Sequence, residues 1–374
     1  MKIAQIAPLI ESVPPRLYGG TERIVSYLTE ELVRQGHEVT LFASGDSRTA
    51  ARLVACCDSA IRLSPSFGDP LPHHLIMADM VRRRAQEFDV LHFHVDLVHL
   101  PLFRDIARRT VTTLHGRLDM ADLEPFFTHF DDMPLVSISN HQRRPLPRAQ
   151  WAGTVHHGLP TDLYRPGLGG GYLAFLGRIC PEKRPDRAIE IARRAGLKLR
   201  IAAKVDPVDQ RYFDTEIRPL LDHPLVEYLG EIEEREKGAF LGGARALLFP
   251  IDWPEPFGLV MIEAMACGTP VVAWRCGSVP EVIEPGLSGY IVDTIDDAVA
   301  AVRNVETLDR ALIRARFEAR FTAARMAEDY LALYRTIAPA AEREVIDMPR
   351  FALRAPAWRD IARGESSAAQ DSGR

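Results

Sequence analysis

The most informative stretch of the sequence carries two glutamates eight residues apart, Glu255 and Glu263, within EPFGLVMIEAMACGTPVV. The pattern predicts a strand that runs into a loop holding Glu255, followed by a helix over about 259–267. Gly258 allows a ligand to approach the backbone closely, and the free amides at a helix start bind anions such as phosphate. Carboxylates accept hydrogen bonds from sugar or ribose hydroxyls. Either glutamate alone would more often be a solvated acid, but the full context favours a site for a hydroxyl-bearing, anionic ligand.

Two cations, Arg178 and Lys183, stand in GRICPEKRP, directly after an expected strand. Arginine can hold two phosphate oxygens at once, whereas lysine is a compact point charge. Negative charge builds on the bridging oxygen when a nucleoside diphosphate leaves, so fixed cations there stabilise the transition state more than the ground state. The pair alone would be interpreted as a solvated basic loop. Its combination with the two glutamates favours a diphosphate site.

Alternating strands and helices must position these residues. Thr21 offers an N-cap to a helix over 21–36, in which Ile24, Leu28 and Leu32 share one face, and Gly36 ends it. In the first half, strands are expected over 2–10, 37–45, 89–94, 110–116 and 134–139, with further helices over 77–88 and 100–109. In the second half, strands are expected over 171–177, 197–204, 226–230, 246–250, 270–274 and 289–292, with helices over 184–196, 311–321 and 322–337. This alternation predicts two parallel sheets, each covered by helices on both faces.

The Pro/Gly-rich stretch PTDLYRPGLGGG separates the two halves. The expected domains are 1–160, a linker over 161–171, 172–320, a helix over 321–338 that packs back on the first domain, and an irregular or partly disordered tail over 339–374. Two doubly wound sheets joined by one linker leave a cleft between them, and parallel sheets bind ligands at the carboxyl ends of their strands. The cleft is therefore the expected site.

Composition narrows the function classes. The 374 residues carry a formal net charge of −5, which argues against nucleic acid as the main partner. No run reaches the length of a membrane span, and MKIAQIAPLI is better interpreted as a buried strand than as a signal peptide. The five cysteines show no C-x-x-C spacing. Reduced thiols and a cytoplasmic location are therefore expected.

Together these residues resemble the retaining glycosyltransferases of family four over roughly residues 2–337. The resemblance implies the GT-B fold, an α/β architecture in which two Rossmann-like doubly wound domains face a central cleft. It also implies transfer of a hexosyl group from a UDP- or GDP-linked nucleotide sugar, with retention, to an acceptor that the sequence does not identify (sugar, lipid or small molecule). Family members work without a bound metal or cofactor, which fits the missing D-x-D motif.

The resemblance assigns roles residue by residue. Arg178 and Lys183 would contact the donor diphosphate as catalytic cations. Glu255 would lie against the sugar, and Glu263 would bind the ribose hydroxyls. The backbone of three consecutive residues would approach the sugar and the phosphates, and a two-glycine loop would close on the donor from the first domain: Phe257, Gly258 and Leu259, and Gly19 and Gly20.

Five histidines fall in or near segments of this pattern: His92, His94, His115, His156 and His157. His115, in TTLHG, looks like the family histidine that contacts the donor sugar or helps to place the acceptor. His94 is interpreted as a buried structural histidine, and His156 and His157 as part of the hinge. Their spacing is not that of a zinc site on one helix.

Two further basic features have competing interpretations. Many relatives carry a Gly-rich turn where this chain has Ala202-Ala203-Lys204, so the base preference stays open and Lys204 is interpreted as a solvated strand-end charge rather than a third phosphate cation. Three arginines, 82–84, stand on one predicted helix with Ile76, Met77 and Met80 nearby. A solvated face is favoured over weak peripheral contact with an anionic membrane, because the apolar face is small.

Three alternative functions remain. A retaining sugar phosphorylase or nucleotide-sugar epimerase of the same fold would use the same cations. A nicotinamide-dependent oxidoreductase is disfavoured because no G-x-G-x-x-G follows the first strand. A non-catalytic carbohydrate-binding protein would not need cations converging on a phosphate site.

Overall fold

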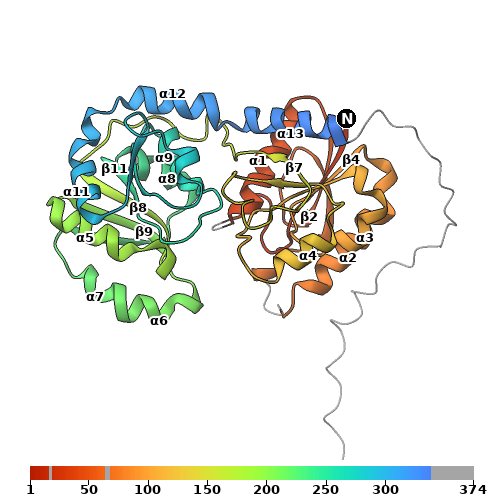
Figure 1. Cartoon of the computed structure of the whole chain (residues 1–374), viewed down its shortest axis with the longest axis horizontal. Coiled ribbons are helices and arrows are strands. Elements are labelled where there is room, and N and C mark those ends of the chain that lie inside the picture. Colours follow the sequence, from red (N-terminus) through yellow and green to blue (C-terminus); the bar gives the residue numbers. More distant parts are fainter. Residues whose placement is uncertain (17–18, 64–67, 338–374) are drawn as a thin grey trace, which may run out of the picture. The chain divides into compact units, whose positions relative to one another are not determined.

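The computed structural model describes residues 1–16, 19–63 and 68–337; the tail predicted over 339–374 lies outside the described residues. Within this part, a seven-stranded parallel sheet has the order β3-β2-β1-β4-β5-β6-β7. Its strands are β1 Lys2–Ile6, β2 Glu38–Ser44, β3 Arg52–Cys57, β4 Val90–Phe93, β5 Thr110–Thr113, β6 Leu135–Ser137 and β7 Trp151–Thr154. We call this sheet and the helices against it the N-terminal domain (Figure 1).

A second, six-stranded parallel sheet of the described residues has the order β10-β9-β8-β11-β12-β13. Its strands are β8 Tyr172–Arg178, β9 Lys198–Lys204, β10 Val226–Gly230, β11 Ala246–Phe249, β12 Val271–Trp274 and β13 Gly289–Val292. This sheet defines the C-terminal domain. Each sheet reverses its strand order beside its first strand, at β1/β4 and at β8/β11, which is where doubly wound sheets bind ligands. The predicted α/β class of two doubly wound domains is confirmed.

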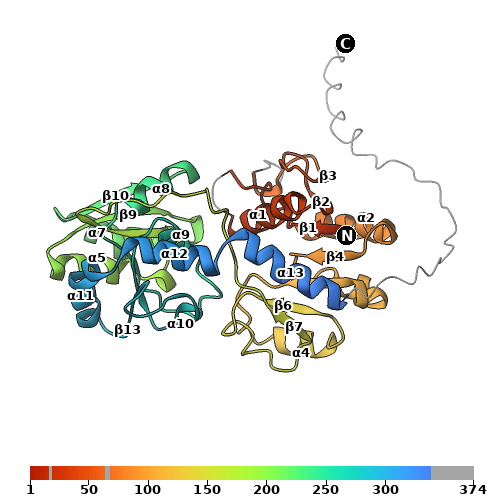
Figure 2. The ribbon, with the colours of Figure 1, turned by 90° about the horizontal axis from the view of Figure 1, so that it is seen from above.

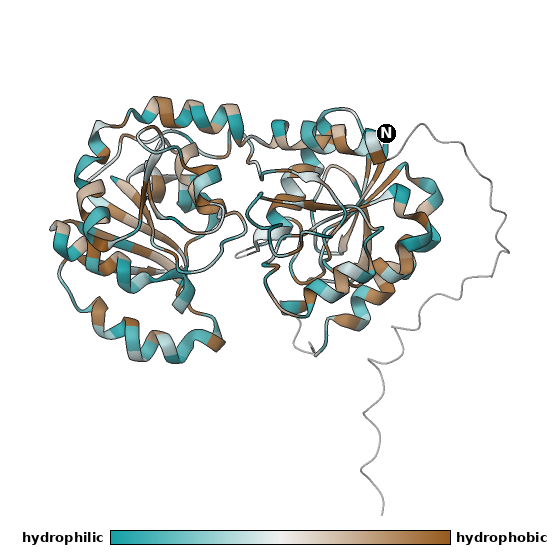
Figure 3. Cartoon of the chain, in the orientation of Figure 1, coloured by the Kyte–Doolittle hydropathy of each residue, from teal (hydrophilic) through white to brown (hydrophobic). Residues whose placement is uncertain are grey.

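Helices cover both sheets. The N-terminal domain carries α1 Gly20–Arg34, α2 Leu71–Arg83, α3 Leu100–Phe103, α4 Leu123–His129 and α13 Ala323–Ile337. The C-terminal domain carries α5 Pro185–Ala195, α6 Gln210–Tyr212, α7 Arg218–Leu221, α8 Glu234–Gly242, α9 Leu259–Ala266, α10 Val279–Val282, α11 Ile295–Asn304 and α12 Arg310–Arg320. The hydrophobic colour gathers along the strands and on the helix faces turned towards them (Figure 3). Burial of these faces on both sides of each sheet forms the cores.

Several expected helix boundaries are wrong. Thr21 is not an N-cap, because α1 begins one residue earlier with Gly19 in the cap position and no side-chain cap bond. The helix expected over 77–88 begins at Leu71, where a proline stands in its first turn. The helix expected over 100–109 continues past α3 only as a 3-10 turn, because Ile106 has non-helical dihedrals.

The chain crosses between the two domains twice, and the crossings pair with each other. The amide of Leu159 donates to the carbonyl of Phe321 at 2.9 Å, and the amide of Ala323 donates to Leu159 at 2.8 Å. After the second crossing, α13 lies beside α1 of the N-terminal domain (Figure 2). The expected linker over 161–171 is bonded to the C-terminal domain, for example from Arg310 Nε to the carbonyl of Gly167 at 3.0 Å. The backbone of this segment is therefore held against the C-terminal domain.

Candidate functional site

A pocket of about 550 Å³ opens where carboxyl ends of strands from both sheets meet. The residues that end β8, β9 and β11 line it from the C-terminal domain, and the segments that follow β1 and β5 line it from the N-terminal domain. All ten residues predicted for the site are among those that line it: Gly19, Gly20, His115, Arg178, Lys183, Glu255, Phe257, Gly258, Leu259 and Glu263. The fold thus brings residues up to 244 positions apart in the sequence into one cavity.

The two predicted phosphate cations are held in place by carboxylates. Lys183 forms an ion pair with Glu255, and its Nζ lies 4.8 Å from the ring centre of Trp253. Trp253 Nε1 donates to the same carboxylate at 3.0 Å. Arg178 donates to Glu182 Oε1 at 2.6 Å. Both cations are therefore fixed before any ligand binds, which is the condition for preorganised electrostatic stabilisation.

The loop after β11 turns sharply into α9. Gly258, the residue before the helix, has φ 80°, and a Cβ there would lie 2.8 Å from Met261 Cε. Gly277 supports the loop from behind, because a Cβ there would lie 2.4 Å from the backbone nitrogen of Glu255. The helix begins at Leu259, as predicted. Leu259 lines the pocket, so the free amides of the first turn lie at the pocket wall. This arrangement can bind an anion beside the Glu255 carboxylate.

Glu263 is buried and belongs to an ion-pair chain that the sequence did not predict. Its Oε1 lies 3.0 Å from Lys237 Nζ, which also lies 3.1 Å from Glu234 Oε2. Glu234 in turn pairs with Arg23 of α1 at 2.5 Å, so the chain joins the two domains. Although burial lowers it, the pKa of Lys237 is raised overall by the two carboxylates. The Glu233-x-x-Glu236 capping box starts α8 and was the available signal that Lys237 stands on a helix.

A buried hydrogen-bond chain fixes the protonation of His115. Gln5 Nε2 donates to the Tyr334 hydroxyl at 3.2 Å, so its Oε1 accepts from His94 Nε2 at 2.8 Å. Burial holds the pKa of His94 well below its usual range and lowers that of His115 to about 3, so both rings are neutral. His94 Nδ1 therefore accepts from His115 Nε2 at 2.9 Å, and His115 Nδ1 is left as an acceptor. The interpretation of His94 as a buried structural histidine is confirmed.

The structure corrects the interpretation of Lys204 and adds to that of His157. Lys204 is not a solvated strand-end charge: its side chain is 11% exposed, pairs with Asp206 at 2.8 Å and lines the pocket. Lys204 is the last residue of β9, and the sheet places that strand end at the cavity. The burial of its side chain therefore depends on the fold and could not be predicted from the local sequence. His157 is not only hinge structure, because it lines the pocket with its ring stacked 5.3 Å from that of His115.

The arginine run of α2 is fully engaged in ion pairs. Arg83 pairs with Asp79 at 2.7 Å and Arg84 with Glu87 at 2.6 Å, while Arg82 pairs with Asp105. Pairing reduces the charge that this face could offer to an anionic surface. No helix in the described part of the chain is long and apolar enough to cross a membrane. Over the same residues, no group of three or more His, Cys, Asp or Glu side chains is arranged to hold a metal ion.

Comparison with known proteins identifies both halves of the chain. A sequence profile described as Glycosyltransferase Family 4 matches residues 18–158, and one described as Glycosyl transferases group 1 matches residues 167–320. A D-inositol 3-phosphate glycosyltransferase of Mycolicibacterium smegmatis is 31% identical over 84% of this chain and 86% of its own length. A phosphatidyl-myo-inositol mannosyltransferase of Mycobacterium leprae is 25% identical over 92% of this chain and 99% of its own length.

Solved structures share the fold. AviGT4, a glycosyltransferase involved in avilamycin A biosynthesis, superposes with a TM-score of 0.69 at 22% identity, covering 91% of this chain and 99% of its own. Anabaena HepE, solved in complex with UDP-glucose, superposes with a TM-score of 0.64 at 17% identity, covering 89% of this chain and 98% of its own. The two sequence profiles and the 31% identical relative agree with the geometry of the pocket. The chain belongs to the family 4 glycosyltransferases and has their GT-B fold.

Proposed function

We propose that this glycosyltransferase moves a hexosyl group from a UDP- or GDP-linked sugar to a hydroxyl acceptor and retains the anomeric configuration. The observation that carries the proposal is the convergence of Arg178, Lys183 and Glu255 in one pocket, beside the start of α9. A diphosphate fits the two cations and the helix amides. The Glu263 carboxylate on the same helix offers acceptors for ribose hydroxyls.

The proposed chemistry is electrostatic. As the bond between the sugar and the phosphate breaks, charge grows on the departing oxygen, and Arg178 and Lys183 stabilise it. In the front-side route, that oxygen also takes the proton of the attacking acceptor hydroxyl. His115 is neutral, so it would hydrogen-bond a sugar hydroxyl rather than add a third positive charge. Because fixed cations do the work that a metal does elsewhere, we propose activity without a divalent metal or other cofactor.

The acceptor proposal comes from the relatives. The Mycolicibacterium protein is named for D-inositol 3-phosphate and the Mycobacterium leprae protein for phosphatidyl-myo-inositol. We therefore propose a polyhydroxylated ring of the inositol type as the acceptor class to test first. Inositol 3-phosphate and phosphatidylinositol are tested as separate acceptors.

The test begins with thermal-shift titration of the full chain against UDP-, GDP- and ADP-sugars, since a ligand of the folded state stabilises it as ln(1 + [L]/Kd). The stabilising donor is then incubated with inositol 3-phosphate or phosphatidylinositol, with and without excess EDTA. We expect a glycosylated product with the donor's anomeric configuration by NMR, at a rate unchanged by chelation. Release of hexose 1-phosphate on adding inorganic phosphate would indicate a phosphorylase instead of a transferase. An isomerised donor without transfer would indicate an epimerase.

A further inference from the structure

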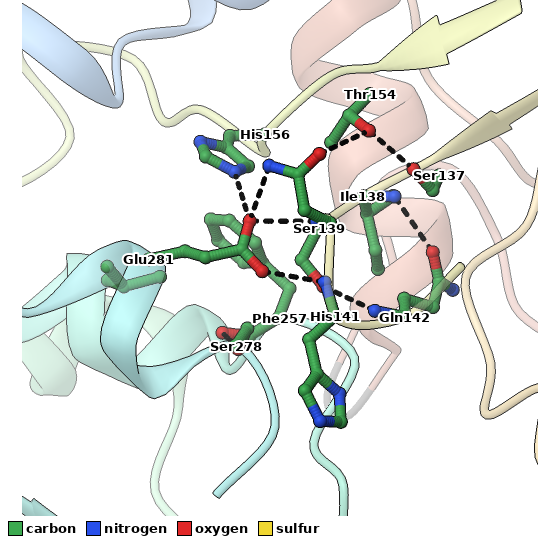
Figure 4. Close-up of polar contacts among 12 residues, drawn as sticks. Ser137, Ile138, Ser139, His141, Gln142, Thr154, His156, Phe257, Ser278 and Glu281 are labelled. Carbon is green, nitrogen blue, oxygen red and sulfur yellow. Dashed lines mark hydrogen bonds and ion pairs between the residues drawn. The ribbon is translucent and has the colours of Figure 1, made fainter. Parts of the chain in front are cut away.

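A single carboxylate of the C-terminal domain receives four hydrogen bonds from the N-terminal domain. Glu281, on α10, accepts from the backbone amides of Asn140 and His141 at 2.8 and 2.7 Å. The side-chain amide of Asn140 donates to it at 3.0 Å, and His156 Nε2 lies 3.2 Å away. Figure 4 shows these donors gathered around the carboxylate from two segments of the N-terminal domain. We call these four residues the Glu281 clasp.

On its own side, the clasp is fixed to the loop that carries the catalytic glutamate. Ser278, the residue before α10, donates its amide to the carbonyl of Glu255 at 3.0 Å. Its hydroxyl donates to the carbonyl of Phe257 at 2.7 Å (Figure 4). Glu281 is less than one helical turn from Ser278, so the backbone that carries its carboxylate is bonded to the Glu255–Phe257 loop.

On the opposite side, the clasp is fixed to the loop that carries His115. Gln142 Oε1 accepts from the amide of Ile138 at 2.8 Å, which closes the turn that contains Asn140 and His141. Gln142 Nε2 donates to the carbonyls of Leu114 at 2.9 Å and Gly116 at 2.8 Å. Those two carbonyls flank His115. The turn is therefore bonded to the His115 loop on both sides of His115.

We propose that Glu281 is a positioning residue that holds the Glu255 loop and the His115 loop in register across the pocket. Two consecutive backbone amides, a side-chain amide and an imidazole converge on one ionised oxygen pair, and charge-assisted bonds of this kind are the strong ones. The consequence for catalysis rests on the proposed function. The contact between the domains is independent of the proposed function, because it is given by the hydrogen bonds to Glu281.

The protonation of Glu281 agrees with this role. Burial alone would raise its pKa, but the bonds from His156, Asn140 and His141 outweigh burial and lower the pKa to about 2. The carboxylate is therefore ionised at any pH at which a sugar transfer would be assayed.

Glu284 supplies the matched control. It stands three residues along the chain and pairs with Arg316 at 2.9 Å and with Arg320, both on α12 of its own domain. Amide hydrogen exchange is measured on the full-length wild type, Glu281→Ala and Glu284→Ala. We expect faster exchange at Asn140 and His141 in Glu281→Ala alone. Unchanged protection there would overturn the clasp, whether or not the protein proves to transfer sugar.

The kinetic arm separates positioning from binding. Misplacement of a catalytic group by about 1 Å can cost about 10²-fold in rate, so we expect Glu281→Ala to lower kcat by about 10- to 100-fold. Donor KM should change by less than about threefold, because the contacts proposed for the diphosphate and the ribose, at Arg178, Lys183 and Glu263, lie within the C-terminal domain. Glu281→Gln keeps one acceptor oxygen, so its kcat should fall between those of the wild type and Glu281→Ala. This variant carries the test if Glu281→Ala does not fold. A kcat equal to that of Glu284→Ala would contradict the proposal.

Discussion

Lys183 is the side chain on which the proposed chemistry depends most. It is paired with Glu255 and packed against Trp253, so its charge is fixed before the donor arrives. Lys183→Ala should lower kcat by about 10²–10³-fold with a smaller effect on donor binding. The reason is that the leaving diphosphate, which Lys183 would contact, gains negative charge mainly as the bond to the sugar breaks. Lys198→Ala, at the exposed start of β9, removes the same charge from the same domain and should leave kcat unchanged. Near-normal kcat in folded Lys183→Ala would show that the diphosphate site is misplaced.

Glu263 should behave in the opposite way. Its carboxylate is buried and held by Lys237, and a ribose contact is equally strong before and during the reaction. We therefore expect Glu263→Ala to raise the donor KM while kcat changes little. Steady-state kinetics with the donor varied at saturating acceptor distinguishes the two effects. A collapse of kcat at unchanged KM would assign Glu263 to the chemistry instead.

Most of the predicted site residues share a segment with another member of the site, and His115 is the exception. The motif around Glu255 and Glu263 and the loop of Arg178 and Lys183 each carry several informative residues in a row. Lys237 and Glu281 carry no such context, since each gains its role from partners brought together by the fold. Residues of that kind become visible only once the strands are in place.

The helix start at α9 is the element that joins the backbone to the ligand. Gly258 holds a positive φ and would place a Cβ 2.8 Å from Met261, so Gly258→Ala should displace this turn. Gly36, after α1, has φ 83° and open space around a Cβ, so Gly36→Ala has the same conformational cost without the clash. We expect the left-handed backbone conformation to lower the free energy of unfolding of both variants by about 1–2 kcal/mol, as measured by urea unfolding. Only Gly258→Ala should also weaken nucleoside diphosphate binding, and equal affinity in both would contradict this view of α9.

The central strands, which are buried on both faces, were predicted in both sheets, and the half-exposed edge strand β10 was predicted as well. The central strands of each sheet are apolar runs, and the structure has them within a few residues of the expected positions. The edge strands β3 and β7 were missed. Strand β7 is short and only half-buried along its length, whereas β3 does carry an apolar run, Leu53 to Cys57, which was not predicted as a strand. Helix α8 was missed because polar residues stand on more than one of its faces: Glu234 and Lys237 line the pocket, while Arg235 faces solvent. This arrangement removes the usual amphipathic pattern.

At the scale of the whole molecule, buried neutral histidines tie stability to pH. Burial lowers the pKa of His92, His94, His115 and His157, and that of His99 to about 3. The unfolded chain binds more protons than the folded chain below about pH 6.5, so the free energy of unfolding falls as pH decreases from there towards 3. Carboxyl groups whose pKa is raised by desolvation oppose this effect: Glu11, Glu22 and Asp209, and Asp96 with a pKa of about 6.

Urea unfolding at pH 7.5 and 5.5 measures this effect. We expect a loss of roughly 1 kcal/mol for each histidine that stays neutral in the folded state, summed over the set. The same free energy of unfolding at both pH values would mean that these rings are hydrated or charged in the folded protein.

Calorimetric titration of the full chain with a nucleoside diphosphate, and with its nucleotide sugar, tests the central claim most directly. The terminal phosphate of the diphosphate carries the charge that develops in the transition state, whereas the intact donor does not. In the Arg178→Ala/Lys183→Ala variant we expect the diphosphate to lose about 10²-fold in affinity and the nucleotide sugar markedly less. Failure of the wild type to bind UDP, GDP or ADP, or equal losses for the two ligands in the variant, would contradict the account.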